Sequence, residues 1–283
     1  MPSHPAQRFQ APSSIQHGTP LKEVLGPDLI KLVGESFADI LPEFDRRRFE
    51  RAANAGLDAL EFNQRGQHIG RALGQQLPLP FSKTCQVLLA AFGPELTATE
   101  GNGLAPFFYM PHAHVISELG IHDVEHGLRA NYELTKRMTA EFSIRPFLVK
   151  HRDHCLRQLA EWASDPSPHV RRLVTEGTRP RLPWAMRLKE FQQDPTFTLP
   201  LLELLKDDEE LYVRRSVANH LADILKDHPD IALATCERWV DEASTKTLPA
   251  HVAKGRRWIV RHAVRLPAKK GDARANAIRE AAK

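Results

Sequence analysis

Cysteine is scarce in this 283-residue sequence, which contains only Cys85, Cys155 and Cys236. Because they are few, odd in number and far apart, they form neither a disulfide framework nor a zinc site, and we interpret them as reduced thiols. No apolar run reaches the ~18 residues of a membrane-spanning helix, and no charged segment leads into an apolar stretch as in a secretory signal. These absences predict a cytoplasmic protein with no membrane partner.

Aromatic residues make up only 7% of the chain, and Gly only 15 residues. Val, Ile and Thr do not dominate, which argues against an all-β fold, whereas abundant Leu, Ala, Arg and Glu favour helix. The 39 Lys and Arg exceed the 35 Asp and Glu, for a formal charge of +4. This balance permits a nucleic-acid partner without requiring one.

The domain organisation follows from the apolar pattern. Residues 1–20 are rich in Pro and Ser and lack acidic residues, so we expect a flexible N-terminal tail. A helical period runs over 21–267, with single helices expected over 44–61 and 131–147, and 268–283 reads as a polar C-terminal tail. Between the helices, Glu100–Pro111 combines turn residues with three adjacent aromatics and predicts a loop followed by a buried anchor.

The second half of the chain repeats itself. The segment Asp165–Arg172 recurs as Asp208–Arg215, 43 residues later, and a weaker copy, Arg256–Val260, follows after another 42. Each copy has an expected helix upstream, over 153–162, 198–205 and 231–240. Periods of about 40–47 residues with two helices each are typical of HEAT and armadillo repeats. The sequence therefore predicts an all-α, HEAT-like solenoid of stacked antiparallel helix pairs with a concave face formed by the second helices.

An Arg-led polar stripe lies on four of the expected helices. The stripes combine residues at i, i+4 and i+8 spacing, and they comprise Arg137, Glu141 and Arg145; Arg172 and Glu176; Arg215, Asn219 and Asp223; and Arg257, Arg261 and Arg265. One interpretation is a set of surface ion pairs worth only ~0.3–0.5 kcal/mol each. For Arg171 and Arg214 we favour a structural ladder between repeats.

The segment Thr175–Trp184 favours a functional interpretation of the stripes. It leaves the expected helix at Gly177 and adds Arg179, Arg181 and an indole beside them. A local basic excess suits phosphates, and Trp suits stacking on a base or sugar. A metal site is disfavoured, because His122 and His126 are spaced by four but Asp123 stands where a zinc protease has Glu. The sequence also lacks a phosphate-binding Gly loop and a G-x-S-x-G elbow.

Four long strings resemble the AlkC family of DNA alkylation-repair glycosylases, relatives of AlkD. They are Glu100–Tyr109, Thr139–Phe147, Pro168–Trp184 and Tyr212–Asp223 with Lys226–Pro229. The resemblance runs from about Leu21 to about Gly271 and implies a HEAT-like fold. It also implies hydrolysis of the N-glycosidic bond of cationic alkylated bases such as 3-methyladenine and 3-methylcytosine in double-stranded DNA. No cofactor or metal is implied, and we expect a monomer at the bacterial nucleoid.

The resemblance also implies roles for particular residues. The active-site residues would be Glu141, Glu176, Asp223 and Trp184. The DNA phosphates would be held by the basic residues Arg137, Arg145, Arg172, Arg179, Arg181, Arg215 and Lys226. Some relatives continue into an immunoglobulin-like C-terminal domain, whereas this sequence stops at Lys283, so we expect a short form.

Two alternatives remain open at this point. A non-catalytic HEAT scaffold explains the repeats and the charge but gives no reason for three carboxylates and Trp184 together. A damage-sensing DNA binder that has lost catalysis is the other, and retention of all four candidate active-site residues argues against it.

Overall fold

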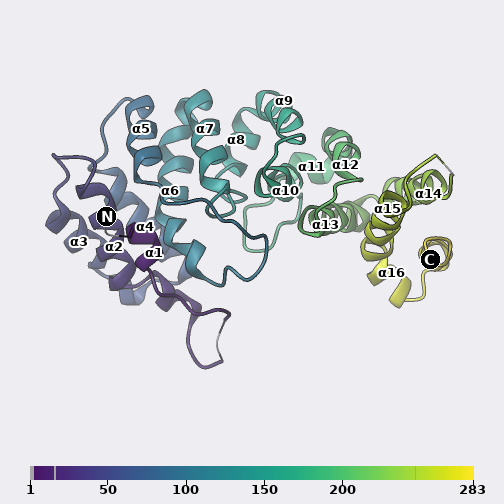
Figure 1. Cartoon of the computed structure of the whole chain (residues 1–283), viewed down its shortest axis with the longest axis horizontal. Coiled ribbons are helices and arrows are strands. Elements are labelled where there is room, and N and C mark those ends of the chain that lie inside the picture. The colour runs from purple at the N-terminus through teal and green to yellow at the C-terminus, as the bar shows by residue number, and fades with distance from the viewer. Residues whose placement is uncertain (1–2, 16, 246) are drawn as a thin grey trace. The chain divides into compact units, whose positions relative to one another are not determined.

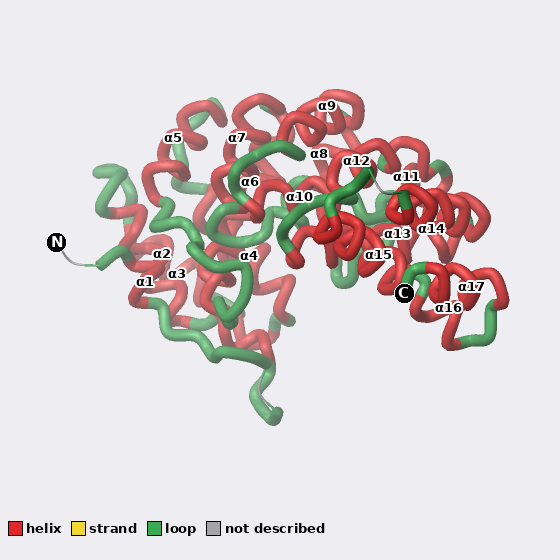
Figure 2. The backbone as a smooth tube through the Cα atoms, turned by 45° about the vertical axis from the view of Figure 1, so that its right-hand side comes forward, coloured by secondary structure: helices red, strands yellow, loops and turns green. Residues whose placement is uncertain are grey.

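The protein is described by a computed structural model that covers residues 3–15, 17–245 and 247–283. Over these residues the chain is helical with connecting loops and contains no strand, which confirms the predicted all-α class (Figure 2). Within the same residues, no helix is both long enough and apolar enough to cross a membrane. The helices divide into two compact units, residues 1–150 and residues 151–283.

Unit 1 is built from pairs of helices and short 3-10 turns (Figure 1). Within it, α2 packs on α3, α4 on α6, and α5 on α7. Its helices are α1 (Pro5–Arg8), α2 (Pro27–Ala38), α3 (Arg46–Asn54), α4 (Phe62–Gly74), α5 (Phe81–Ala91), α6 (Met110–Leu119), α7 (Val124–Thr135) and α8 (Arg145–Lys150). The Glu100–Pro111 segment behaves as predicted, since a loop leads into the 3-10 helix Ala105–Tyr109, whose Phe108 is fully buried.

The predicted extents of two helices in unit 1 are wrong. The expected helix over 44–61 ends at Asn54, because Gly56 adopts the left-handed conformation (φ 72°) that breaks a helix. The expected helix over 131–147 is interrupted between Thr135 and Arg145. Pro146 has no N–H to donate to the preceding turn, so helix α8 can only begin beside it. Arg137, Glu141 and Arg145 therefore do not form a stripe on one helix.

Unit 2 contains the repeated helix pairs. The pairs are α9 (Arg152–Trp162) with α10 (Pro168–Gly177), α12 (Leu199–Leu205) with α13 (Leu211–Asp227), and α14 (Pro229–Ser244) with α15 (Ala250–Ala263). The second helices α10, α13 and α15 pack in succession, which confirms the predicted HEAT-like layering. Shorter helices α11 (Lys189–Gln193), α16 (Arg265–Lys269) and α17 (Ala273–Ala281) complete the unit.

Arginine side chains mark the 43-residue repeat in three dimensions. Arg171 Nη1 donates to the carbonyls of Asp165 and Pro166, and Arg214 Nη1 donates to the equivalent carbonyls of Asp208 and Glu209. Arg171 also forms a two-pronged ion pair with Asp208 of the next repeat, at 2.6 and 3.1 Å. These contacts agree with the structural ladder inferred for Arg171, whereas these contacts of Arg214 lie within its own repeat.

Both ends of the chain contain more structure than the expected tails. Helix α1 is capped by His4, packs on α2 and buries Pro5, and Phe9 directly after the helix is also buried. Helix α17 is capped by Asp272, whose side chain accepts from the Ala275 N–H, and it packs on α14 with Ile278 buried. Each helix therefore buries an apolar side chain in its own unit, and this burial offsets the entropy lost on ordering.

Candidate active site

Glu176 lies in the last turn of α10, which also carries the fully buried Val170, Leu173 and Val174. Its own side chain is only 5% exposed. Oε1 accepts from Arg179 Nη1 at 2.7 Å and lies 3.3 Å from Arg172 Nη2. Burial opposes ionisation of Glu176, but the charges of Arg172 and Arg179 outweigh it and hold its pKa below the usual value.

Asp223 lies near the end of α13 and is 1% exposed. Its two oxygens accept from different cations, with Arg179 Nε 2.9 Å from Oδ2 and Lys226 Nζ 2.9 Å from Oδ1. The sequence placed Asp223 on a surface stripe with Arg215 and Asn219. Instead it turns toward α10, because α13 is packed between α10 and α15 and only part of its circumference faces solvent.

Arg179 joins the two carboxylates. It follows the end of α10 and is 9% exposed, with Nη1 on Glu176 and Nε on Asp223, which are 47 residues apart in sequence. Burial opposes its charge, yet the two carboxylates raise the pKa of Arg179. We call the side chains of Glu176, Asp223 and Arg179 together the acidic cluster.

Hydroxyl and imidazole groups of α10 and α13 surround the acidic cluster. Ser216 Oγ donates to Glu176 Oε2 at 2.7 Å, and Thr175 Oγ1 lies 2.7 Å from Ser216 Oγ. His220, fully buried, has Nδ1 2.9 Å from the carbonyl of Thr175, and burial lowers its pKa to about 4. His220 is therefore neutral at physiological pH.

Trp184 stands apart from the acidic cluster in its exposure, which is 68%. It lies in the loop from α10 to α11 and has a left-handed backbone (φ 63°), an unfavourable conformation for a bulky residue. The loop is anchored just before this residue. Leu182 is buried, and Arg181 forms an ion pair with Asp227, with Nε 2.7 Å from Oδ2. The indole is thus held at the surface by a fixed loop.

Glu141 belongs to unit 1 and lies in the turn between α7 and α8. It is 9% exposed, and Thr139 Oγ1 donates to its Oε2 at 2.7 Å. In the same turn, Ser143 Oγ donates to Asn131 Oδ1 at 2.6 Å, and this bond connects the turn to α7. The interruption of the expected helix is therefore what positions this carboxylate.

The predicted phosphate-binding residues differ widely in accessibility. Arg145 is fully buried, and Arg137 donates to the Gly93 carbonyl and pairs with Glu133, so neither presents a free face to a phosphate. Arg172 lies over the Tyr212 ring at 5.0 Å. Arg179 and Arg181 are held by carboxylates, as described above. The exposed members are Arg215 and Lys226.

Sequence reasoning did not assign the region around Arg265, although Arg265 lay in one of its stripes. Arg265 Nη2 and His262 Nε2 both approach Asn219 Oδ1, at 3.4 and 3.3 Å, and Trp258 stacks on His262 with ring centres 4.9 Å apart. Burial, with the charges of Arg265 and Arg215, lowers the pKa of His262 to about 4. Burial and Arg179 also lower the pKa of Arg265. Such crowding of cations is typical of a surface that meets an anion.

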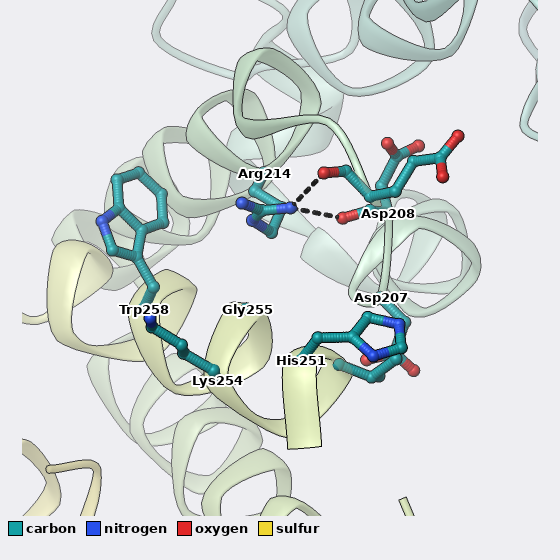
Figure 3. A pocket seen from close by; sticks show the side chains of 9 residues that line it. Asp207, Asp208, Arg214, His251, Lys254, Gly255 and Trp258 are labelled. Atoms are coloured by element: carbon teal, nitrogen blue, oxygen red, sulfur yellow. Dashed lines mark hydrogen bonds between the residues drawn. The ribbon is translucent and has the colours of Figure 1, made fainter. Parts of the chain in front are cut away.

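A separate cavity of about 350 Å³ lies at the other end of α13 (Figure 3). Its walls include Arg214, His251, Lys254 and Trp258 beside the 207–209 turn. Two acidic side chains of the cavity form ion pairs with other residues of unit 2, Asp207 with Arg256 and Asp208 with Arg171. Among the described residues, no group of three His, Cys, Asp or Glu side chains is arranged to hold a metal.

The fold and the acidic cluster together define a HEAT-like repeat protein with buried, arginine-paired carboxylates on its second helices. No protein-family model matches the chain. It is 32% identical over 259 residues to the uncharacterized protein YhaZ of Bacillus subtilis strain 168, covering 91% of this chain and 67% of YhaZ.

A solved structure, Pseudomonas fluorescens alkylpurine DNA glycosylase AlkC bound to DNA containing an abasic site analog, is also similar. Its TM-score is 0.79 and its identity 34%, over 92% of this chain and 68% of that one. The chain belongs to the AlkC family of DNA glycosylases.

Proposed function

We propose that this protein is a DNA glycosylase that removes cationic alkylated bases, such as 3-methyladenine and 3-methylcytosine, from double-stranded DNA. The observation that carries the proposal is the acidic cluster, in which Glu176 is buried yet held ionised. Support comes from the 34% identity to AlkC, which was solved with DNA containing an abasic site analog.

The chemistry of the lesion suits this cluster. Alkylation at N3 makes the base cationic and therefore a good leaving group, so protonation of the base contributes little. The deoxyribose instead becomes positively charged as the C1′–N bond breaks, as in O-glycoside hydrolysis. The carboxylates of Glu176 and Asp223 stabilise this developing charge, and one of them orients the attacking water. Trp184 offers a π-face to the electron-poor sugar.

Binding to the DNA backbone is the role of exposed cations. Lys226 is 51% exposed at its side chain and Arg215 is also open to solvent. Arg172 borders the cluster from the Tyr212 ring. Arg265 lies near these residues, with Nη2 3.4 Å from Asn219 Oδ1 on α13. These residues position phosphates and carry no sequence information.

The test is release of bases from methylated duplex DNA by the purified protein, measured under single-turnover conditions. Glu176→Gln and Asp223→Asn keep the shape of each side chain and remove its charge. Each is expected to slow release of 3-methyladenine by ~100-fold, with a larger loss for 3-methylcytosine, a poorer leaving group. Wild-type protein that releases neither base would overturn the proposal.

Glu203→Gln provides a matched control in unit 2. Burial opposes ionisation of Glu203, but hydrogen bonds from Arg238, Lys206 and Trp239 lower its pKa to about 2. It is a stabilised carboxylate like Glu176, but it lies on α12 in a different hydrogen-bonded group. The control should lose stability and keep the wild-type rate of base release.

A further inference from the structure

We propose that Arg179 is a positioning residue of the active site, which holds the carboxylates of Glu176 and Asp223 at a fixed separation and keeps Glu176 ionised, and that it does not contact DNA phosphate. This inference rests on the proposed function, in which the two carboxylates act on the sugar. It assigns to Arg179 a different role from the phosphate contact that the sequence suggested.

The geometry of the guanidinium carries the inference. Nη1 is 2.7 Å from Glu176 Oε1, and Nε is 2.9 Å from Asp223 Oδ2, so two adjacent nitrogens of one rigid plane bind two carboxylates. Arg179 is 9% exposed, whereas a guanidinium that binds a phosphate needs its paired N–H donors open to solvent. A guanidinium suits this task because its planar donors have a fixed spacing, which a lysine ammonium lacks.

Without the guanidinium, two buried carboxylates from α10 and α13 would face each other. Like charges in a shared site favour uptake of a proton by one of them. A protonated carboxyl group neither stabilises a sugar cation nor accepts a proton from water. Other cations also lie at the pair, with Arg172 at Glu176 and Lys226 at Asp223.

The other groups around the pair do not titrate between pH 5 and 8. Burial lowers the pKa of His220 to about 4, so its ring stays neutral over this range. The surrounding arginines stay charged; they are Arg172, Arg181 and Arg265. A change in proton uptake after loss of Arg179 is therefore assigned to the carboxylates.

The experiment compares Arg179→Gln and Arg179→Lys with wild type in single-turnover base release from pH 5 to 8. We expect Arg179→Gln to be ~100-fold slower at pH 6, with the acidic limb of its profile moved upward by about one pH unit or more. Arg179→Lys restores charge without spanning both carboxylates, so it should recover part of the rate. The slope of log affinity against log salt should remain that of wild type.

A phosphate contact gives the opposite pattern, and that pattern would overturn the inference. The salt slope of Arg179→Gln would then fall by ~0.9, while its pH profile would keep the wild-type shape. Arg171→Gln is the matched control, because Arg171 on α10 pairs with Asp208 of the next repeat and lies outside the acidic cluster. It should lose stability with no change in the shape of the pH profile.

A second measurement needs no catalytic activity and so separates the inference from the proposed function. In Arg179→Gln the folded chain should bind more protons than the unfolded chain between pH 5 and 8, because Glu176 would then have a raised pKa. The deficit in unfolding free energy relative to wild type should therefore grow as pH rises. A deficit that is constant from pH 5 to 8 would refute the role of Arg179 even if base release is confirmed.

Discussion

The hydroxyl of Ser216 on α13 donates to Oε2 of Glu176 on α10 at 2.7 Å, while Oε1 faces arginine. The two oxygens of one carboxylate are thereby fixed by separate elements. The positions at which the Glu176 carboxylate can accept further hydrogen bonds are therefore set by the packing of α10 on α13 and not by rotation of the side chain.

Ser216→Ala removes this bond with little change in volume. Because a hydrogen bond to a charged group contributes about 1.5–3 kcal/mol, we expect weaker stability and a roughly 10-fold slower single-turnover release of 3-methyladenine. The control is Ser244→Ala, whose hydroxyl bonds only to the Val240 carbonyl of its own helix. Equal rates for the two variants would contradict a role for Ser216 in orienting Glu176.

Replacement of Trp184 by Gly is predicted to raise stability and to lower activity. A bulky residue at φ 63° costs on the order of 1 kcal/mol, and an indole that is 68% exposed gains little from burial. Trp184→Gly is therefore expected to raise the melting temperature, whereas Trp184→Ala, which keeps the strain, should leave it nearly unchanged. Both should slow base release at least ~10-fold if the π-face contributes to sugar stabilisation. Wild-type rates in both would remove Trp184 from the active site.

The exposed cations predict a salt dependence. Arg215→Ala should weaken binding to duplex DNA and reduce the slope of log affinity against log salt by about one. Arg238→Ala is the control, since Arg238 is half exposed on α14 and paired with Glu203 and Glu242. An unchanged slope in Arg215→Ala, measured by fluorescence anisotropy, would show that Arg215 does not touch phosphate.

His112 predicts an acid-sensitive unit 1. It is fully buried among Phe37, Phe92, Phe108 and Tyr109, and burial, with a smaller effect from His4, lowers its pKa to about 3. Because the unfolded chain has the higher histidine pKa, stability is present above about pH 6.5 and is lost as the pH falls toward 3.

His112→Phe keeps an aromatic ring and removes the titration. It should reduce the acid-dependent loss of unfolding free energy over that range by on the order of 4 kcal/mol. Denaturant titrations from pH 7 to 3.5 measure this directly. His251→Gln, at an exposed histidine, should follow the wild-type curve. A His112→Phe curve parallel to wild type would contradict the assignment.

The repeat was the strongest structural signal in the sequence. The 43-residue offset predicted the helix pairs of unit 2, because Arg171 and Arg214 make equivalent carbonyl contacts in successive copies. The polar stripes at i, i+4 and i+8 spacing placed Glu176 and Asp223 on the second helices. Local periodicity was therefore enough to predict which helices carry both carboxylates.

The pairing inside the acidic cluster was not predictable from spacing. Arg179 lies beyond the end of α10, and its partner Asp223 is 44 residues away, so the contact depends on how α10 and α13 pack. Glu141 shows a different limit. Its i,i+4 spacing from Arg137 and Arg145 suggested one continuous helix, but Pro146 interrupts the backbone hydrogen bonds and a turn forms instead.

The carbonyl anchors of Arg171 and Arg214 also constrain how such a chain can change length. Each guanidinium reaches back across its own inter-helix turn, six residues upstream, to a fixed pair of carbonyls. Loss or gain of one residue in that turn would displace the anchor, whereas duplication of a whole 43-residue segment would carry the anchor and its carbonyls together. Repeats of this type can therefore be gained or lost as whole units, whereas an insertion within an inter-helix turn is expected to be destabilising.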